Sequence, residues 1–300
     1  IRDSINTGGC KMIAAFIDGL FRYQFLQNAL LTSIIVGLIS GVIGSFIILR
    51  GMSLMGDAIS HAVLPGVAVS YMFGFNYIFG ASIFGLLAAL SIGFITQKSP
   101  LKNDTAIGVV FSSFFALGII FISFAKSSTD LYHILFGNVL AVADTDILIT
   151  CVVGVIVLIF VALFYKELQL TSFDPTMAQA YGLNIQFFHY ALMFLLTLVA
   201  VSSLQTVGTI LVIAMLITPA ATAYLLTNHL PTMIGLASTF GILSSVIGLF
   251  FSYSYNLASG ATIVLTAALF FLLAFFFSPK KGLVFVNREK EMEESTNEKI

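Results

Sequence analysis

The strongest constraint in this sequence is its series of long apolar segments separated by short polar ones. About 20 consecutive, mostly apolar residues suffice for a helix to cross a bilayer. Nine candidate segments cover residues 25–49, 57–75, 77–97, 105–125, 146–165, 186–204, 206–227, 231–253 and 257–277. The second and third are short and closely spaced, so eight spans are the alternative if two segments are half-helices. We predict an all-α polytopic membrane protein with about 8–9 transmembrane helices.

The charge content excludes an ordinary soluble domain. Only 9% of the 300 residues are Asp, Glu, Lys or Arg, against about 25% in soluble proteins. This low charge content makes membrane lipid the expected surrounding. The net charge of −1 gives no basic surface that would attract nucleic acid. Two distant cysteines, Cys10 and Cys151, exclude a disulfide framework or a CxxC metal site.

The ends of the chain differ from its middle. Residues 1–11 are polar and precede Met12, and we interpret them as a non-native or disordered segment, with a genuine flexible N-terminus as the alternative. Residues 12–281 form the predicted transmembrane domain. Residues 282–300 are charged without an apolar stripe, which predicts a solvated cytoplasmic tail. Within the domain, residues 130–143 are too short to span and suggest a surface or re-entrant helix.

The distribution of Lys and Arg predicts the orientation, because cytoplasmic loops are enriched in both. We place the C-terminus and the loops after the first, third and fifth spans on the cytoplasmic side. Two basic residues, Arg22 and Lys126, then lie on the external side. The six on the cytoplasmic side are Arg50, Lys98, Lys102, Lys166, Lys280 and Lys281. The N-terminus is then external.

Apart from acids in loops, at span ends and in the terminal segments, one acidic residue remains, Asp57, in GMSLMGDAISHAVLPGVAVSY (51–71). His61 follows it by four residues, so both side chains would share one face of a helix. A carboxylate and an imidazole suit Mn²⁺, Fe²⁺ or Zn²⁺, and ionisable groups inside a membrane usually serve function. Alternatively, Asp57 is a helix N-cap and His61 a buried polar contact. Two further metal ligands must come from elsewhere or from a second copy of the chain.

The longest polar stretch between spans is KELQLTSFDPTMAQAYGLN (166–184). Asp174 and Pro175 suit the N-cap and first position of a helix, and Gly182 could end it. A short capped helix on the cytoplasmic side suggests a docking element, although an ordinary connecting loop is the alternative. The sequence contains no Gly-Lys pair and hence no P-loop, so any ATP must be bound by another chain.

Three segments together resemble a known family. GMSLMGDAISHAVLPGVAVSY, SFDPTMAQAYG (172–182) and SLQTVGTILVIAMLITPAATAYLL (203–226) are similar, in the same order, to the metal-ion permeases of ABC transporters, the ABC-3 family. The resemblance runs from Met12 to about Lys281. It implies the fold of type II ABC importers, a bacterial cell membrane location and no enzymatic activity in this chain. Within the family, the sequence looks most like manganese permeases.

The resemblance also implies roles and partners. Asp57 and His61 match the family's GDAISH motif, which is associated with the metal path. The family's DPxxAxxxG pattern maps onto the ATPase-coupling helix at residues 174–182, through Asp174, Pro175, Ala178 and Gly182. The implied partners are a second copy of the chain, a cytoplasmic ATP-binding subunit and a metal-binding lipoprotein outside. No cofactor would be bound permanently, since Mn²⁺ is the cargo.

Alternatives to a manganese importer remain open. An Asp/His pair without Cys also suits Zn²⁺ and Fe²⁺. An ion-coupled secondary transporter would use Asp57 for coupling, but the later half shows no second broken segment of the same kind. An intramembrane enzyme is disfavoured, because no HExxH motif is present.

Overall fold

The computed structural model describes residues 12, 14–125 and 142–278, and this part of the chain is helical without strands. The helices are α2 (Gln24–Leu49), α3 (Met55–Ala62), α4 (Leu64–Phe73), α5 (Tyr77–Lys98), α6 (Asn103–Ala125), α8 (Asp144–Leu163), α9 (Tyr165–Phe173), α10 (Pro175–Ala180), α11 (Ile185–Val207), α12 (Thr209–Leu226), α13 (Leu230–Tyr255) and α14 (Ser259–Phe277). Residues 1–11, most of segment 130–143 and the tail 282–300 lie outside the described residues.

Eight of the described helices are long and apolar enough to cross a membrane: α2, α5, α6, α8, α11, α12, α13 and α14. The all-α membrane fold is thereby confirmed. The segment predicted as one span over 57–75 instead forms two short helices, α3 and α4, which meet at Val63. Pro65 lies in the first turn of α4, where it lacks an N–H group and crowds the preceding turn, so the helix breaks there.

Helices α2 and α13 pack closely through small residues. A Cβ atom on Gly37 would lie 2.8 Å from the carbonyl carbon of Gly241, and one on Gly41 would lie 2.6 Å from the amide nitrogen of Ser238. The Ser245 hydroxyl donates to the Ser33 carbonyl oxygen on α2 over 3.0 Å. In a bilayer, where lipid is as apolar as a side chain, such close backbone approach and interhelical hydrogen bonds hold helices together.

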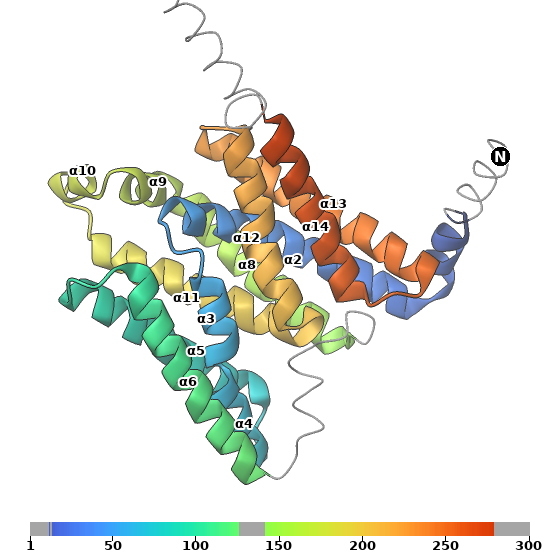
Figure 1. Cartoon of the computed structure of the whole chain (residues 1–300), viewed down its shortest axis with the longest axis horizontal. Helices are drawn as coiled ribbons and strands as arrows, with labels where there is room; N and C mark the ends of the chain where they lie inside the picture. The colour runs from blue at the N-terminus through green and yellow to red at the C-terminus, as the bar shows by residue number, and fades with distance from the viewer. Residues whose placement is uncertain (1–11, 13, 126–141, 279–300) are drawn as a thin grey trace, which may run out of the picture.

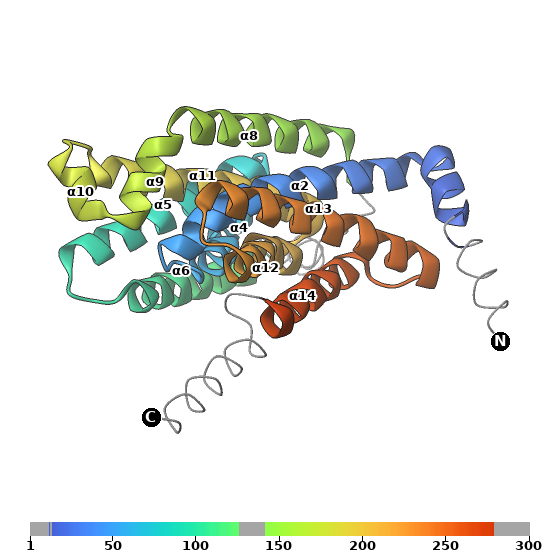
Figure 2. The same ribbon diagram turned by 90° about the horizontal axis from the view of Figure 1, so that it is seen from above.

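The helices form two groups joined by α11. Helices α3, α4, α5 and α6 lie together, while α2, α12, α13 and α14 form the other group (Figure 1). Helix α8 covers one face and α14 lies on the opposite one (Figure 2). The α2–α3 loop, the α5–α6 loop and helices α9 and α10 all lie at one end, at the left of Figure 1, which we call the α10 end.

The α10 end gathers the basic residues that the sequence predicted to be cytoplasmic. Arg50, Lys98, Lys102 and Lys166 belong to the loops and helices at this end. Lys126, Lys280 and Lys281 lie outside the described residues. Assignment of this end to the cytoplasm stays a prediction from the charge distribution.

Candidate functional site

Asp57 and His61 lie one turn apart on α3 with their side chains together. The Nε2 atom of His61 is 3.4 Å from Oδ1 of Asp57, and the two side chains are 25% and 40% exposed, respectively. The shared face predicted from their spacing is therefore confirmed. The alternative that Asp57 caps the helix is wrong, because the N-cap residue is Leu54 and Asp57 is the third helical residue.

The imidazole of His61 is held between α3 and two aromatic rings of α6. The ring centres of Phe111 and Phe115 each lie 5.7 Å from that of His61, in edge-to-face geometry. Its Nδ1 atom is buried without a hydrogen-bond partner. Behind the pair, Ile59 is fully buried, and Gly56 lets α3 approach Leu216 of α12. The packing thus orients one carboxylate and one imidazole on the remaining face of α3.

The pair is an incomplete metal site within one chain. Among the residues that the structure describes, no three His, Cys, Asp or Glu side chains come close enough to hold a metal ion. A carboxylate oxygen and an imidazole nitrogen are ligands for first-row divalent metals, so the pair could supply two ligands of a larger set. The metal role of Asp57 and His61 stays a prediction.

The predicted capped helix forms over the expected residues. The carboxylate of Asp174 accepts a hydrogen bond from the Met177 amide over 2.9 Å, and Pro175 occupies the first turn of α10. Gly182 adopts a left-handed φ of +78°, which favours glycine, and ends the segment. Ala178 is fully buried, whereas Met177 and Tyr181 are exposed. The segment therefore presents apolar side chains outward, and its coupling role stays a prediction.

Arg50, expected from the sequence only as a cytoplasmic loop charge, makes specific contacts in the structure. It caps the C-terminus of α2 and reaches α9, where its Nε donates to Ser172 Oγ over 3.0 Å and its Nη2 to Thr171 Oγ1 over 2.8 Å. Burial lowers the pKa of Arg50 to about 10, so the side chain remains charged near neutral pH. The only hint in the sequence was its position immediately before the GMSLMGDAISH segment.

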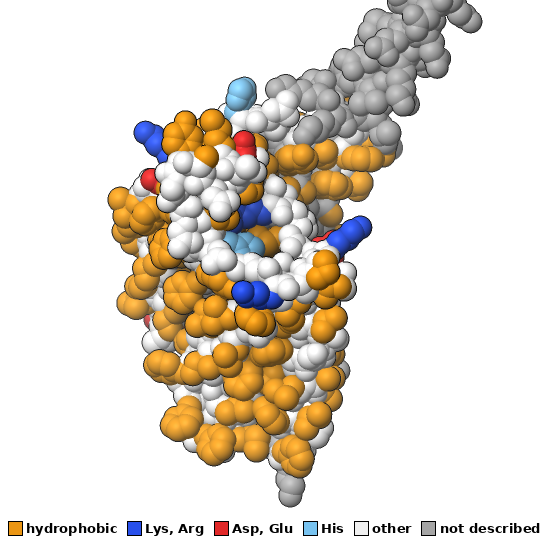
Figure 3. All heavy atoms as spheres, turned by 90° about the vertical axis from the view of Figure 1, so that its left-hand side faces the viewer, with side chains coloured by type: hydrophobic (Ala, Val, Ile, Leu, Met, Phe, Trp, Pro, Cys, Tyr) orange, Lys and Arg blue, Asp and Glu red, His pale blue; other side chains and the backbone are white. Residues whose placement is uncertain are grey.

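A hollow opens on the face at the α10 end, with basic and histidine side chains visible inside it (Figure 3). His189 of α11 has a buried Nε2 atom without a hydrogen-bond partner. His229 is exposed in the loop before α13. His133 lies outside the described residues.

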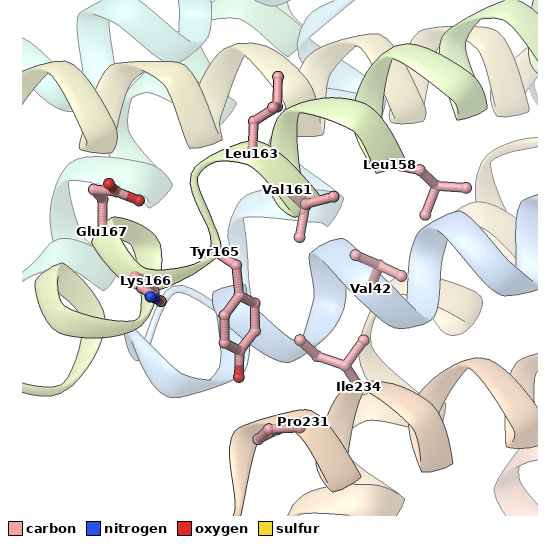
Figure 4. Close-up of a pocket in the computed structure, with 10 residues that line it drawn as sticks. Val42, Leu158, Val161, Leu163, Tyr165, Lys166, Glu167, Pro231 and Ile234 are labelled. Atoms are coloured by element: carbon pink, nitrogen blue, oxygen red, sulfur yellow. The ribbon is translucent and has the colours of Figure 1, made fainter.

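A lateral pocket lies away from the Asp57–His61 pair. Its volume is about 670 Å³, and its walls come from α2, α8, α9 and α13. Val42, Val161 and Ile234 point into it, and Tyr165 of α9 lies at its edge near Pro231 (Figure 4). The pocket leaves one side of α9 without close packing.

Comparison with known proteins gives a consistent result. The model of the family described as the ABC 3 transport family matches residues 22–278. The chain is 68% identical to the manganese transport system membrane protein MntC of Listeria monocytogenes, over 93% of this chain and 99% of that protein. It is 61% identical to the manganese import system permease protein ScaB of Streptococcus gordonii, over 90% and 97% of the two chains.

A solved structure is also similar. In "PsaBC from Streptococcus pneumoniae in complex with Fab", one chain is 61% identical to this one and superposes with a TM-score of 0.81. The match covers 90% of this chain and 97% of that chain. At this identity and coverage, the fold and the sequence point to the same family.

Proposed function

This chain belongs to the ABC 3 transport family, and from that premise we propose that it is the permease subunit of an ATP-driven importer of divalent transition metal ions, with Mn²⁺ as its cargo. The eight long apolar helices among its described residues make it a multi-pass membrane protein. The manganese assignment is supported by the names of MntC and ScaB. The absence of a P-loop from the sequence supports ATP binding on a separate subunit.

The observation that carries this proposal is the Asp57–His61 pair on the broken α3–α4 segment. Broken helices are tolerated in membranes where they line a cavity or pack against protein. Here the break places a carboxylate and an imidazole together, with the imidazole held by Phe111 and Phe115. A dehydrated divalent cation would find two ligands preformed on one helix face.

We assign the remaining ligands to a second copy of the chain. Two protomers related by a two-fold axis would each contribute Asp57 and His61, giving two carboxylates and two imidazoles. Two carboxylates also neutralise the charge of one divalent cation, which lowers the cost of holding it inside the membrane. The affinity should be modest, because a transport site must release the ion that it binds.

The energy for transport would enter through α10. The capped helix, with Met177 and Tyr181 exposed, offers an apolar surface to an ATP-binding subunit. Movement of residues 174–182 with nucleotide binding and hydrolysis would open the site alternately to each side of the membrane. An external metal-binding lipoprotein would deliver the ion and select it, since N/O ligand sets bind Zn²⁺ more strongly than Mn²⁺.

Replacement of Asp57 tests this proposal directly. Asp57→Ala should abolish Mn²⁺ uptake in cells that depend on this chain, while the variant still assembles with its ATP-binding subunit. Asp104→Ala, at an exposed acid in the first turn of α6, is the matched control and should transport normally. Normal uptake by Asp57→Ala would refute the proposal.

A zinc or iron importer is the second candidate, because the same carboxylate–imidazole pair suits all three metals. Cellular Mn, Zn and Fe contents, measured with and without this chain, distinguish them. A loss confined to Mn supports the manganese assignment, and a loss of Zn or Fe instead replaces it. Uptake that survives deletion of the ATP-binding subunit would indicate an ion-coupled secondary transporter.

A further inference from the structure

Arg50 joins the two parts of the molecule that the proposed function requires to move together. It lies at the C-terminal end of α2, five residues before α3 begins at Met55. Its guanidinium reaches Thr171 and Ser172, the third and second residues before Asp174, which caps α10. The contact crosses more than 120 residues of sequence, so the tertiary fold alone creates it.

The α9 side of this contact is continuous with α10. The Asp174 amide donates to the Leu170 carbonyl over 2.9 Å, so the N-cap residue of α10 still belongs to the hydrogen-bonded end of α9. Leu168 and Thr171 are buried and anchor α9 from within. The pocket beside Tyr165 leaves another side of α9 open. Helices α9 and α10 can therefore shift together without displacing closely packed side chains on that side.

The α3 side of the contact is short and stiff. The Gly51 amide donates to the Ile48 carbonyl and the Met52 amide to the Ile47 carbonyl, each over 3.1 Å, which closes the end of α2. Met52 is only 3% exposed. The Met55 amide then donates to the Met52 carbonyl over 3.0 Å, directly at the start of α3. A displacement at Arg50 is thus passed to the helix that carries Asp57 and His61.

The chemistry of Arg50 favours a transmitting role over simple stability. Burying a guanidinium without a carboxylate partner costs free energy. Among the described residues, the ion pair within 4.0 Å joins His61 and Asp57, so Arg50 has no carboxylate partner there. Its partners are the two hydroxyl groups of Thr171 and Ser172. Both hydroxyls also donate to carbonyls of their own helix, from Thr171 to Glu167 and from Ser172 to Leu168. They would remain satisfied without Arg50, so its removal leaves no orphaned polar group on α9.

We propose that Arg50 is a positioning residue that mechanically couples α9–α10 to α3, so that movement at the ATPase-docking helix reaches the Asp57–His61 pair. The proposal rests on the proposed function, since it assumes an ATPase at α10 and a metal at α3. A charged guanidinium with two hydrogen bonds is suited to this task, because bonds to charged groups are stronger and more directional than neutral ones.

The test uses the complete transporter, with its ATP-binding subunit, reconstituted in proteoliposomes. Mn²⁺ uptake and ATP hydrolysis are measured together, and their ratio is the readout. Arg50→Gln removes both charged hydrogen bonds and should lower Mn²⁺ uptake by at least about tenfold, while ATP hydrolysis continues. Arg50→Lys, which keeps the charge and a donor, should restore part of the coupling. Lys166→Gln, at an exposed cation on α9 itself, should leave the ratio unchanged.

A second variant approaches the contact from the other side. Thr171→Val combined with Ser172→Ala removes both acceptors and leaves Arg50 in place, and it should reproduce the uncoupling. Adding Arg50→Gln to this pair should have little further effect, because all three substitutions break the same contact. A wild-type ratio in either the Arg50→Gln or the Thr171/Ser172 variant overturns the proposal, as does an equal loss of uptake and hydrolysis.

Asp57→Ala in the same assay separates this proposal from the proposed function. If Asp57→Ala transports Mn²⁺ normally, the metal site itself is wrong. If Asp57→Ala fails to transport while Arg50→Gln keeps a wild-type ratio, only the coupling role of Arg50 is wrong.

Discussion

The Nε2 atom of His61 lies 3.4 Å from Oδ1 of Asp57, one helical turn away on α3. This contact orients the imidazole, and the edge-to-face rings of Phe111 and Phe115 restrain it from α6. A metal ion entering here would replace a weak interaction between two side chains with two coordinate bonds.

Replacing the imidazole should stop transport. His61→Ala removes one of the two proposed ligands on α3. We expect Mn²⁺ uptake to fall by at least about tenfold, because losing a ligand commonly costs more metal affinity than losing a residue that only supports one. Radioactive manganese uptake in cells measures the effect. His229→Ala, at an exposed histidine before α13, is the control. If both variants take up Mn²⁺ equally well, His61 is not on the metal path.

The aromatic restraint on His61 should have a smaller effect. Phe115→Ala removes one edge-to-face partner, worth about 0.5–1.5 kcal/mol, and should raise the Mn²⁺ concentration for half-maximal uptake by about two- to tenfold. Phe124→Ala, at an exposed ring on the same helix, should leave it unchanged. If the two substitutions have the same effect, the contact with His61 plays no part.

The close packing of α2 against α13 should make small residues there essential to stability. A Cβ on Gly41 would lie within 2.7 Å of backbone atoms of Ala237 and Ser238, so Gly41→Ala should destabilise the protein by about 1–3 kcal/mol. Thermal unfolding of the purified protein in detergent measures this. Gly235→Ala adds a Cβ with nothing within 4 Å and should be neutral or slightly stabilising. An unchanged Tm for Gly41→Ala would contradict the packing.

The cap on α10 should matter for partner binding. Asp174→Ala removes the acceptor for the Met177 amide and should destabilise this short helix by about 1 kcal/mol, weakening co-purification with the ATP-binding subunit. Asp174→Ser restores a capping oxygen and should recover most of the binding. Asn184→Ala removes the equivalent cap on α11, where the side chain accepts from Phe187, and serves as the control. If Asn184→Ala weakens binding equally, α10 has no special role.

Local patterns accounted for much of this protein. Helix α10 could be predicted from Asp174, Pro175 and Gly182, because capping, proline geometry and positive φ are properties of single residues and their neighbours. The shared face of Asp57 and His61 followed from helical periodicity. The break at Val63 was less evident, since Pro65 in an apolar run is compatible with either a kink or two helices.

The contacts of Arg50 and the rings around His61 could not be predicted in this way. Arg50 meets Thr171 and Ser172 across more than 120 residues, and Phe111 and Phe115 lie on a different helix from His61. Nothing in a single sequence states which helices become neighbours.

The sequence alone therefore determined that the chain spans a membrane, where its eight long described helices begin and end to within a few residues, and which side chains could bind a cation. Apolar length, charge spacing and capping are local and additive, so they can be read along the chain. Only the tertiary structure decided that the loop before α3 is bound to the helix before α10. That link depends on the close approach of distant helices, which is set by the packing of all of them at once.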